Sequence, residues 1–347
     1  MYIKKLLVAV FVLGAIVLGI FSYYIYTAVF APNTSFDESS VYVYISSDSN
    51  YMQVRDSLKT KLKNIDNFDA VAQKKGYVGN IKPGRYLLTN GMSNNDIVTS
   101  LRSKNIPINV SFNNQETIEK LAGRISQQIE ADSLSLVEAM LDINYLSETG
   151  FDNETALAMY LPNTYEFYWN TSAKTFTERM HKEYITYWNE SRLEKAKNQN
   201  LTALQVMSLA AIVQKETASV DERPRVAGVY LNRLKIGMLL QADPTVIYAI
   251  KKESDDFEQV IKRVLYRDLE IDSPYNTYKY SGVPHGLIAM PDVSAIEAVL
   301  NPEKHDYLFF VANVDKPGYH LFAKTLAQHN QNKIKYQQWI NAQGVRR

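Results

Sequence analysis

The chain has 347 residues, of which 46% are hydrophobic, and its 38 Lys and Arg nearly balance 37 Asp and Glu to give a formal net charge of +1. Such a balance excludes the strongly basic field of a typical nucleic-acid-binding protein, so no nucleic-acid partner is expected. The absence of cysteine excludes disulfides, thiolate nucleophiles and cysteine-ligated zinc. The five histidines form no closely spaced ligand pair, so we expect neither a metal nor any other cofactor.

The N-terminus predicts a single membrane-spanning helix. Residues 6–30 form an uncharged, largely apolar run that is long enough to cross a bilayer. Lys4 and Lys5 precede it, and the next basic residue is Arg55, which predicts a cytoplasmic tail at 1–5 and everything after the helix outside the cytoplasmic (inner) membrane. A cleaved signal peptide is the alternative, but the length of the apolar run and Pro32 favour a retained anchor.

The next hundred residues alternate short strands and helices. After a polar linker at 31–40, the pattern predicts a small α+β unit over residues 41–130. This alternation resembles glycan-binding modules of the LysM type, although an ordinary structural α+β domain fits it equally well. The expected elements are strands at 41–45, 85–88 and 108–112 and helices at 51–65, 93–101 and 116–129.

Two further regions complete an expected α+β chain. Residues 131–200 are polar and helical in pattern, with an aromatic run at 165–169, and are interpreted as a helical linking region. Residues 201–347 carry most of the motifs and are expected to form a mixed α/β catalytic domain.

The C-terminal domain begins with a helix that places one glutamate on its apolar side. Thr202 and Gln205 have the spacing of a capping box, which predicts a helix from there to Glu216. At about 100° per residue, Glu216 lies only about 40° around the helix from Ile212. Its carboxylate therefore faces the core or the wall of a cleft, where desolvation raises the pKa and makes it suitable as a general acid. A helix-terminal glutamate that turns to solvent, or pairs with a neighbouring cation, is the alternative.

The segments after Glu216 place polar side chains on loops between helices. Pro224 suits the first turn of a second helix, and polar loops follow at 240–245 and 273–278. Amides, hydroxyls and tyrosine rings grouped on such loops fit a sugar-binding groove, but they also fit ordinary turn chemistry.

The motifs in this region carry a resemblance to a known family. They are Val213-Gln214-Lys215-Glu216-Thr217, Glu222-Arg223-Pro224, the run from Val229 to Leu234, the run from Gly237 to Tyr248, Ser273-Pro274-Tyr275-Asn276-Thr277-Tyr278, Gly318-Tyr319-His320-Leu321-Phe322, Lys324-Thr325-Leu326 and His329-Asn330. In order and spacing they resemble the endolytic murein transglycosylase family, also called YceG-like or MltG, over about residues 205–330. Leu161-Pro162-Asn163-Thr164-Tyr165 resembles a further motif of that family.

The resemblance implies that Glu216 is the catalytic acid/base of a lytic transglycosylase. Such an enzyme cleaves MurNAc–GlcNAc bonds in peptidoglycan and leaves 1,6-anhydro-MurNAc ends. The chain departs from the family pattern at Gln214, where a second glutamate is usual, at Ala242, where Thr is common, and at a few positions between His285 and Met290. From residue type and position, the candidate substrate-binding residues are Asn232, Gln241, Asp243, Thr245, Tyr248, Asn276, Tyr278 and His320.

Two other functions remain open on the sequence. One is a hydrolytic muramidase with Asp243 or another acid as its second carboxylate, and the other is a non-catalytic peptidoglycan-binding scaffold for wall synthases. Since a membrane-anchored enzyme reaches only glycan close to the membrane, we expect it to cut nascent strands, to act as a terminase of glycan elongation and to work beside membrane-bound peptidoglycan synthases.

Overall fold

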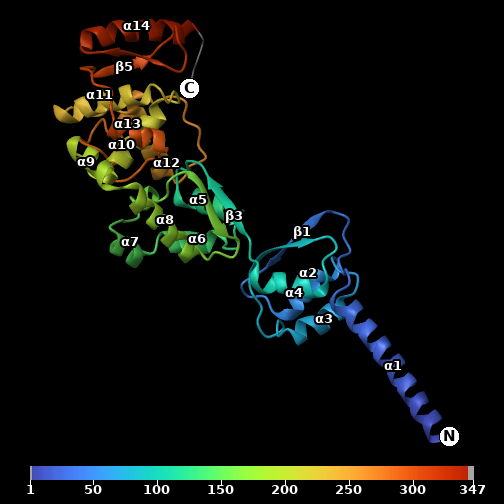
Figure 1. Ribbon diagram of the computed structural model, residues 1–347. Helices are drawn as coiled ribbons and strands as arrows, with labels where there is room; N and C mark the ends of the chain where they lie inside the picture. The colour runs from blue at the N-terminus through green and yellow to red at the C-terminus, as the bar shows by residue number, and fades with distance from the viewer. Residues whose placement is uncertain (1, 343–347) are drawn as a thin grey trace. The chain divides into compact units, whose positions relative to one another are not determined.

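The computed structural model describes residues 2–342 and divides the chain into two compact units (Figure 1). Unit 1 comprises the residues up to Val110 together with Gln128–Ala131 and Tyr165–Ser172. Unit 2 comprises Ser111–Gln127, Asp132–Thr164 and the residues from Ala173 onward. The fold is α+β, with several small sheets and one long apolar helix at the N-terminus.

The N-terminal helix α1 spans Tyr2–Val29, beginning four residues before the expected apolar run. It is long and apolar enough to cross a membrane, and its side chains as far as Tyr26 are exposed. Its last turn belongs to the core of unit 1, because Ala28 is buried and its carbonyl accepts a 2.8 Å hydrogen bond from the Asn94 side chain. The polar segment that follows is also held in place, since Asn33 and Thr34 are buried in unit 1.

Unit 1 packs helices against one antiparallel hairpin, with β1 and β2 paired from Ser40↔Thr89 to Ile45↔Gly84. The helix expected over 51–65 is two helices, because the chain turns after Lys59 and Asn64 caps a new helix. Ser93 caps the next helix as its sequence predicts. The elements are β1 Ser40–Ile45, α2 Tyr51–Lys59, α3 Ile65–Lys74, β2 Gly84–Thr89 and α4 Asn94–Ser103.

Strands β3 (Pro107–Phe112) and β4 (Asn163–Tyr168) pair with each other, and each contains residues of both units. Strand β4 corrects the expectation that residues 131–200 are helical throughout. Its alternating burial places Tyr165 and Phe167 inward, which explains the aromatic run as a strand pattern of period two.

Unit 2 begins earlier in the chain than the expected boundary at residue 130. Helix α5, expected in the small N-terminal unit, packs instead against α6, and α6 packs against α8, so the segment expected to be a linker forms part of the core of unit 2. The apolar stripe of α5 requires a partner, and α6 supplies it. The elements are α5 Ile118–Ser126, α6 Ser133–Met140, α7 Ile143–Thr149, η1 Ala156–Met159, α8 Ala173–Tyr187 and α9 Glu190–Asn198.

Helix α10 is the centre of the second half of unit 2. Every residue from Val206 to Val213 is buried, because α11, α12 and α13 all pack against this helix. The elements are α10 Ala203–Glu216, α11 Arg223–Lys235, α12 Asp243–Ser254, η2 Tyr266–Glu270 and α13 Val293–Leu300.

The C-terminal part of unit 2 is an antiparallel hairpin covered by a helix. Strand β5 (Phe309–Ala312) pairs with β6 (His320–Ala323), and α14 (Leu326–Ala342) packs against both strands, as the red end of the ribbon shows (Figure 1). The hairpin is tied to α11, because the Arg233 guanidinium donates to the Leu308 carbonyl at 2.7 Å and the Asn232 amide donates to the Tyr307 carbonyl at 3.1 Å.

Candidate active site

Glu216 lies in a cavity of about 380 Å³ within unit 2, which we call the Glu216 cavity. Its walls come from the end of α10, from α11, from the start of α12, from the loop before α13, and from β5, β6 and α14. The lining residues are Glu216, Tyr230, Arg233, Leu240, Gln241, Asp243, Tyr278, Phe309, Phe310, Val311, Ala312, His320, Leu326, His329, Asn330, Lys333 and Tyr336.

The end of α10 fixes the position of Glu216. The helix starts with the expected capping box, in which the Thr202 amide donates to the Gln205 side chain at 2.9 Å and the Gln205 amide donates to Thr202 Oγ1 at 3.2 Å. It ends at Glu216 because Thr217 adopts an extended backbone. A carboxylate in the last turn of a helix lies at the negative end of the helix dipole, which disfavours its ionised form.

Tyr230 of α11 is the hydrogen-bond partner of Glu216. Its buried hydroxyl donates to Glu216 Oε1 at 2.6 Å, and among the side chains described, from residue 2 to 339, it is the one with a hydrogen bond to this carboxylate. Burial raises the pKa of Glu216 to about 7, against the lowering effect of the Tyr230 hydrogen bond. The charge of Asp243 raises the pKa further, while His320 and Arg233 oppose it. A carboxyl group with this pKa can give and take a proton near neutral pH.

Asp243 provides a second carboxylate in the same cavity. It is the first residue of α12, is exposed, and accepts a 2.6 Å hydrogen bond from the Tyr278 hydroxyl. Gln241 adopts a positive φ of 51° just before it, and its backbone amide donates to the Thr277 carbonyl at 3.0 Å. The two polar loops predicted from the sequence therefore meet at this carboxylate.

His320 reaches the cavity as the first residue of β6 and is paired with a buried glutamate. Glu222 accepts hydrogen bonds from the His320 backbone amide at 2.7 Å and from His320 Nδ1 at 2.8 Å. Burial alone raises the pKa of Glu222, but these bonds outweigh it and hold the pKa below its usual value. Glu222 is therefore ionised and keeps the proton of His320 on Nδ1.

The structure brings four of the eight candidate substrate-binding residues to the Glu216 cavity, namely Gln241, Asp243, Tyr278 and His320. The other four side chains contact protein groups instead. The Asn232 amide donates to the His305 carbonyl at 2.8 Å, and the buried Asn276 amide donates to the carbonyls of Leu269 and Ile271. Thr245 is buried against Thr277, and the Tyr248 ring packs on Tyr275.

Gln214, which stands where the family pattern has a second glutamate, also holds the backbone. Its side chain donates to the Met290 carbonyl at 3.3 Å and accepts a hydrogen bond from the Asp292 amide. It is not among the residues that line the Glu216 cavity.

Sequence reasoning missed several cavity residues, among them Tyr230 and the residues of β5 and α14. Nothing in a single sequence says that the Tyr230 hydroxyl meets Glu216 fourteen positions earlier. The residues of α14 were missed as a group. Their recurrence on one side of the helix, at Leu326, His329, Asn330 and Lys333, was the signal available.

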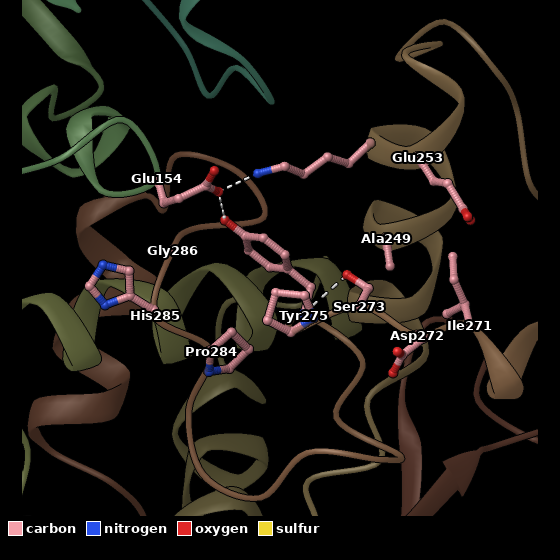
Figure 2. Close-up of a pocket in the computed structure, with 12 residues that line it drawn as sticks. Glu154, Ala249, Glu253, Ile271, Asp272, Ser273, Tyr275, Pro284, His285 and Gly286 are labelled. Atoms are coloured by element: carbon pink, nitrogen blue, oxygen red, sulfur yellow. Dashed lines mark hydrogen bonds and ion pairs between the residues drawn. The ribbon is translucent and has the colours of Figure 1, made fainter.

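Unit 2 has a second cavity, of about 490 Å³, which we call the Glu154 cavity (Figure 2). In Figure 2 the carboxylate of Glu154 points toward the hydroxyl of Tyr275, and that hydroxyl donates to it. The Lys252 ammonium also pairs with Glu154. Burial raises the pKa of Glu154, but the hydrogen bonds from Lys252 and Tyr275 outweigh burial and hold the pKa below its usual value. Since this carboxylate stays ionised, the Glu216 cavity is the better candidate for acid chemistry.

Comparison with known proteins identifies the family of the chain. A model of the YceG-like family matches residues 43–335. The chain belongs to the YceG-like family. The matched range includes every residue that lines the two cavities except Tyr336.

Relatives in this family carry a functional name. A Bacillus subtilis protein named endolytic murein transglycosylase is 32% identical over 318 residues, which are 86% of this chain and 85% of that protein. A Streptococcus pneumoniae protein of the same name is 26% identical over 302 residues, which are 78% of this chain and 53% of that longer protein. A crystal structure of a YceG-like protein from Listeria monocytogenes aligns with a TM-score of 0.56 and 28% identity, covering 84% of this chain and 98% of that one.

Proposed function

We propose that this chain is a peptidoglycan lytic transglycosylase that cleaves MurNAc–GlcNAc bonds within glycan strands, with Glu216 as its acid and base. The observation that carries the proposal is a glutamate whose pKa is about 7, in a cavity that also holds a second carboxylate. The name shared by the Bacillus and Streptococcus relatives supports the substrate and the reaction class.

The proton balance of this reaction needs only one catalytic carboxyl. Protonated Glu216 donates to the oxygen that links MurNAc to GlcNAc, and the bond from that oxygen to C1 of MurNAc breaks. The MurNAc C6 hydroxyl then gives its proton to ionised Glu216, while its oxygen attacks C1 and closes a 1,6-anhydro ring. One proton leaves Glu216 and one returns, and no water is consumed, so the second carboxylate of ordinary glycosidases is not required.

The neighbours of Glu216 have separate tasks in this mechanism. Tyr230 holds one carboxylate oxygen, which leaves the other to exchange the proton with the sugar. Anionic Asp243, held by Tyr278, stabilises the positive charge that develops at C1. Gln241 and His320 line the same cavity and bind the sugars. Asn232, Thr245, Tyr248 and Asn276 act indirectly, by holding the loops that carry these groups.

A hydrolytic muramidase is the second candidate, and one observation favours it. Asp243 lies in the same cavity and close enough to raise the pKa of Glu216, as a second carboxylate must. In that mechanism Asp243 activates a water or attacks C1 directly, and the product has a reducing end.

The N-terminal part of the chain sets where the enzyme acts. Helix α1 anchors the protein in the cytoplasmic membrane with its N-terminus inside, because Lys4 and Lys5 precede its apolar run and no further basic residue occurs before Arg55. Unit 1 acts as a LysM-like glycan-binding module, and its strand–helix–helix–strand order and the exposed Tyr42 and Tyr44 of β1 support this role. The enzyme cuts nascent strands beside membrane-bound synthases and ends their elongation.

Mass spectrometry of peptidoglycan treated with the full chain in detergent tests the reaction. We expect anhydro-muropeptides from the wild type and none from a Glu216→Gln variant. Reducing ends would establish the muramidase instead. Glycan binding without any cleavage by the wild type would establish a scaffold.

A further inference from the structure

One helix face forms a separate wall of the Glu216 cavity. Leu326, His329, Asn330, Lys333 and Tyr336 of α14 line it, at positions i, i+3, i+4, i+7 and i+10 of the helix. Residues at this spacing lie on one stripe of a helix. The stripe lines the cavity, and α14 packs on β5 and β6, where the His329 ring stacks on the Phe309 ring.

The chemistry of this stripe differs from that of the wall around Glu216. The carboxylates of the cavity, Glu216 and Asp243, come from α10 and α12, whereas the stripe carries an ammonium group at Lys333. Burial lowers the pKa of His329, and the charges of Lys333 and Arg233 lower it further, so the imidazole of the stripe is neutral at neutral pH.

Lys333 is the cation of this cavity that is available to a ligand. Arg233 also lines the cavity, but its guanidinium donates to the carbonyls of Leu308 and Leu240. Lys333 is exposed and makes no ion pair or hydrogen bond with any residue whose side chain the structure describes, from 2 to 339. No Asp or Glu occurs among residues 316–347, so no acidic side chain of this segment offsets the positive charge of Lys333.

We propose that Lys333 pairs with a carboxylate carried on the lactyl substituent of the muramic acid bound next to Glu216. This inference rests on the proposed function and names the feature of the glycan that the enzyme selects. A neutral polysaccharide offers this ammonium no partner, whereas every MurNAc carries a lactyl group. In peptide-bearing strands the carboxylate belongs to the peptide attached to that group, and in stripped strands it is the lactyl carboxylate itself.

Cleavage kinetics with the full chain in detergent test this pairing. We compare Lys333→Gln with Lys335→Gln, which removes the same charge from the same helix at a position that does not line the cavity. Lys333→Gln should lower kcat/KM on carboxylate-bearing strands by about ten-fold, mainly through KM, because it removes one charge-assisted hydrogen bond. Lys335→Gln should change it less than about two-fold, since surface charge pairs are weak.

Three substrates identify the carboxylate. If only untreated, peptide-bearing strands respond to Lys333→Gln, the carboxylate lies on the peptide. If strands stripped of peptide by an amidase respond as well, Lys333 also pairs with the lactyl carboxylate that the amidase exposes. Strands whose carboxylates have been converted to amides should be cut equally by both variants. Equal kinetics of the two variants on all three substrates would overturn the proposal.

A binding measurement separates this inference from the proposed reaction. Calorimetric titration of the Glu216→Gln chain with a disaccharide–tripeptide needs no cleavage. Adding Lys333→Gln should weaken the Kd by about ten-fold and reduce its dependence on salt, while adding Lys335→Gln should change neither. If the wild type cut no glycan but binding still depended on Lys333, the proposed function would fail and this inference would stand. Equal Kd values in the two double variants would refute the inference alone.

Discussion

The Glu216 cavity and the Glu154 cavity each contain a glutamate that accepts a hydrogen bond from a buried tyrosine, yet the two carboxyl groups differ in charge. The pKa of Glu216 is raised to about 7, whereas the pKa of Glu154 is held below its usual value. Burial raises both pKa values, and the tyrosine hydrogen bond lowers both. Two features differ. Glu154 is exposed whereas Glu216 is not, and Glu154 pairs with Lys252, which has no counterpart beside Glu216 among the described residues.

This comparison shows what makes one buried glutamate a candidate acid. A tyrosine hydroxyl positions a carboxylate without neutralising it, while an ammonium group fixes it in the ionised form. Arg233 and His320 line the same cavity as Glu216 but are engaged elsewhere, the first with backbone carbonyls and the second with Glu222. Their charges lower the pKa of Glu216 but do not overcome burial.

The largest expected effect is on catalysis. Glu216→Gln should lower the rate of anhydro-muropeptide formation by at least about 10³-fold, because the amide cannot transfer a proton. Glu154→Gln should change the rate less than about two-fold. Mass spectrometry of the digests checks both variants. Retained cleavage in Glu216→Gln, or its loss in Glu154→Gln alone, would reverse the roles of the two cavities.

The next effect is a pair of opposite shifts in the pH dependence of cleavage. Since Glu216 must be protonated to donate, kcat/KM should fall as the pH rises through about 7. Tyr230→Phe removes a hydrogen bond that lowers the pKa of Glu216, so the fall should move to higher pH. Asp243→Asn removes a negative charge that raises this pKa, so the fall should move to lower pH. Each variant should also lose roughly ten-fold in rate at its optimum.

Profiles that shift in the same direction in Tyr230→Phe and Asp243→Asn would contradict this account of the Glu216 pKa. Tyr275→Phe is the matched control, because it removes the equivalent hydrogen bond from Glu154. Its profile should coincide with that of the wild type.

The sequence predicted the position of Glu216 better than its surroundings. The capping box at Thr202 and the apolar stripe ending at Ile212 are local patterns, and they determine where α10 begins and which side of it is buried. The placement of Tyr230 and of the α14 residues at the cavity depends on how elements far apart in the chain pack together, and local sequence patterns do not contain that information. The side-chain amides of Asn232 and Asn276 suggested contacts with sugars, but they donate to backbone carbonyls instead. An amide can hydrogen-bond a sugar or a backbone carbonyl equally well, so the residue type does not distinguish the two.

The fold shows the same limit. The two strands of unit 1 and the helix α4 that Ser93 caps follow from local patterns, and these elements were predicted, whereas the pairing of the strands was not. The assignment of α5 to unit 2 was not, since an apolar stripe says that a helix is covered but not by which element.

A smaller effect concerns stability. Because the pKa of Glu216 is higher in the folded chain than its ordinary value of 4.5, the folded state binds more protons between pH 4.5 and 7. The free energy of unfolding should therefore fall as the pH rises through this window, by up to about 3 kcal/mol. Glu216→Gln avoids that loss, so its Tm should exceed the wild-type Tm by several degrees at pH 8 and match it near pH 4.5. If Glu216→Gln were less stable than the wild type at pH 8, the pKa of Glu216 would not be raised in the folded chain.

The smallest expected effect has the opposite sign and belongs to Glu154. Because its pKa is lowered in the folded chain, its contribution to stability is present above its ordinary pKa and is lost as the pH falls through its folded pKa. Glu154→Gln should therefore lower the free energy of unfolding at pH 8, by less than about 1 kcal/mol because the ion pair with Lys252 is partly exposed. Near pH 3 the difference should shrink, in contrast to Glu216→Gln, whose advantage grows with pH. Thermal unfolding of both variants across this range measures how the difference in stability from the wild type changes with pH. If that difference changed in the same direction for both variants, Lys252 would not distinguish the two glutamates.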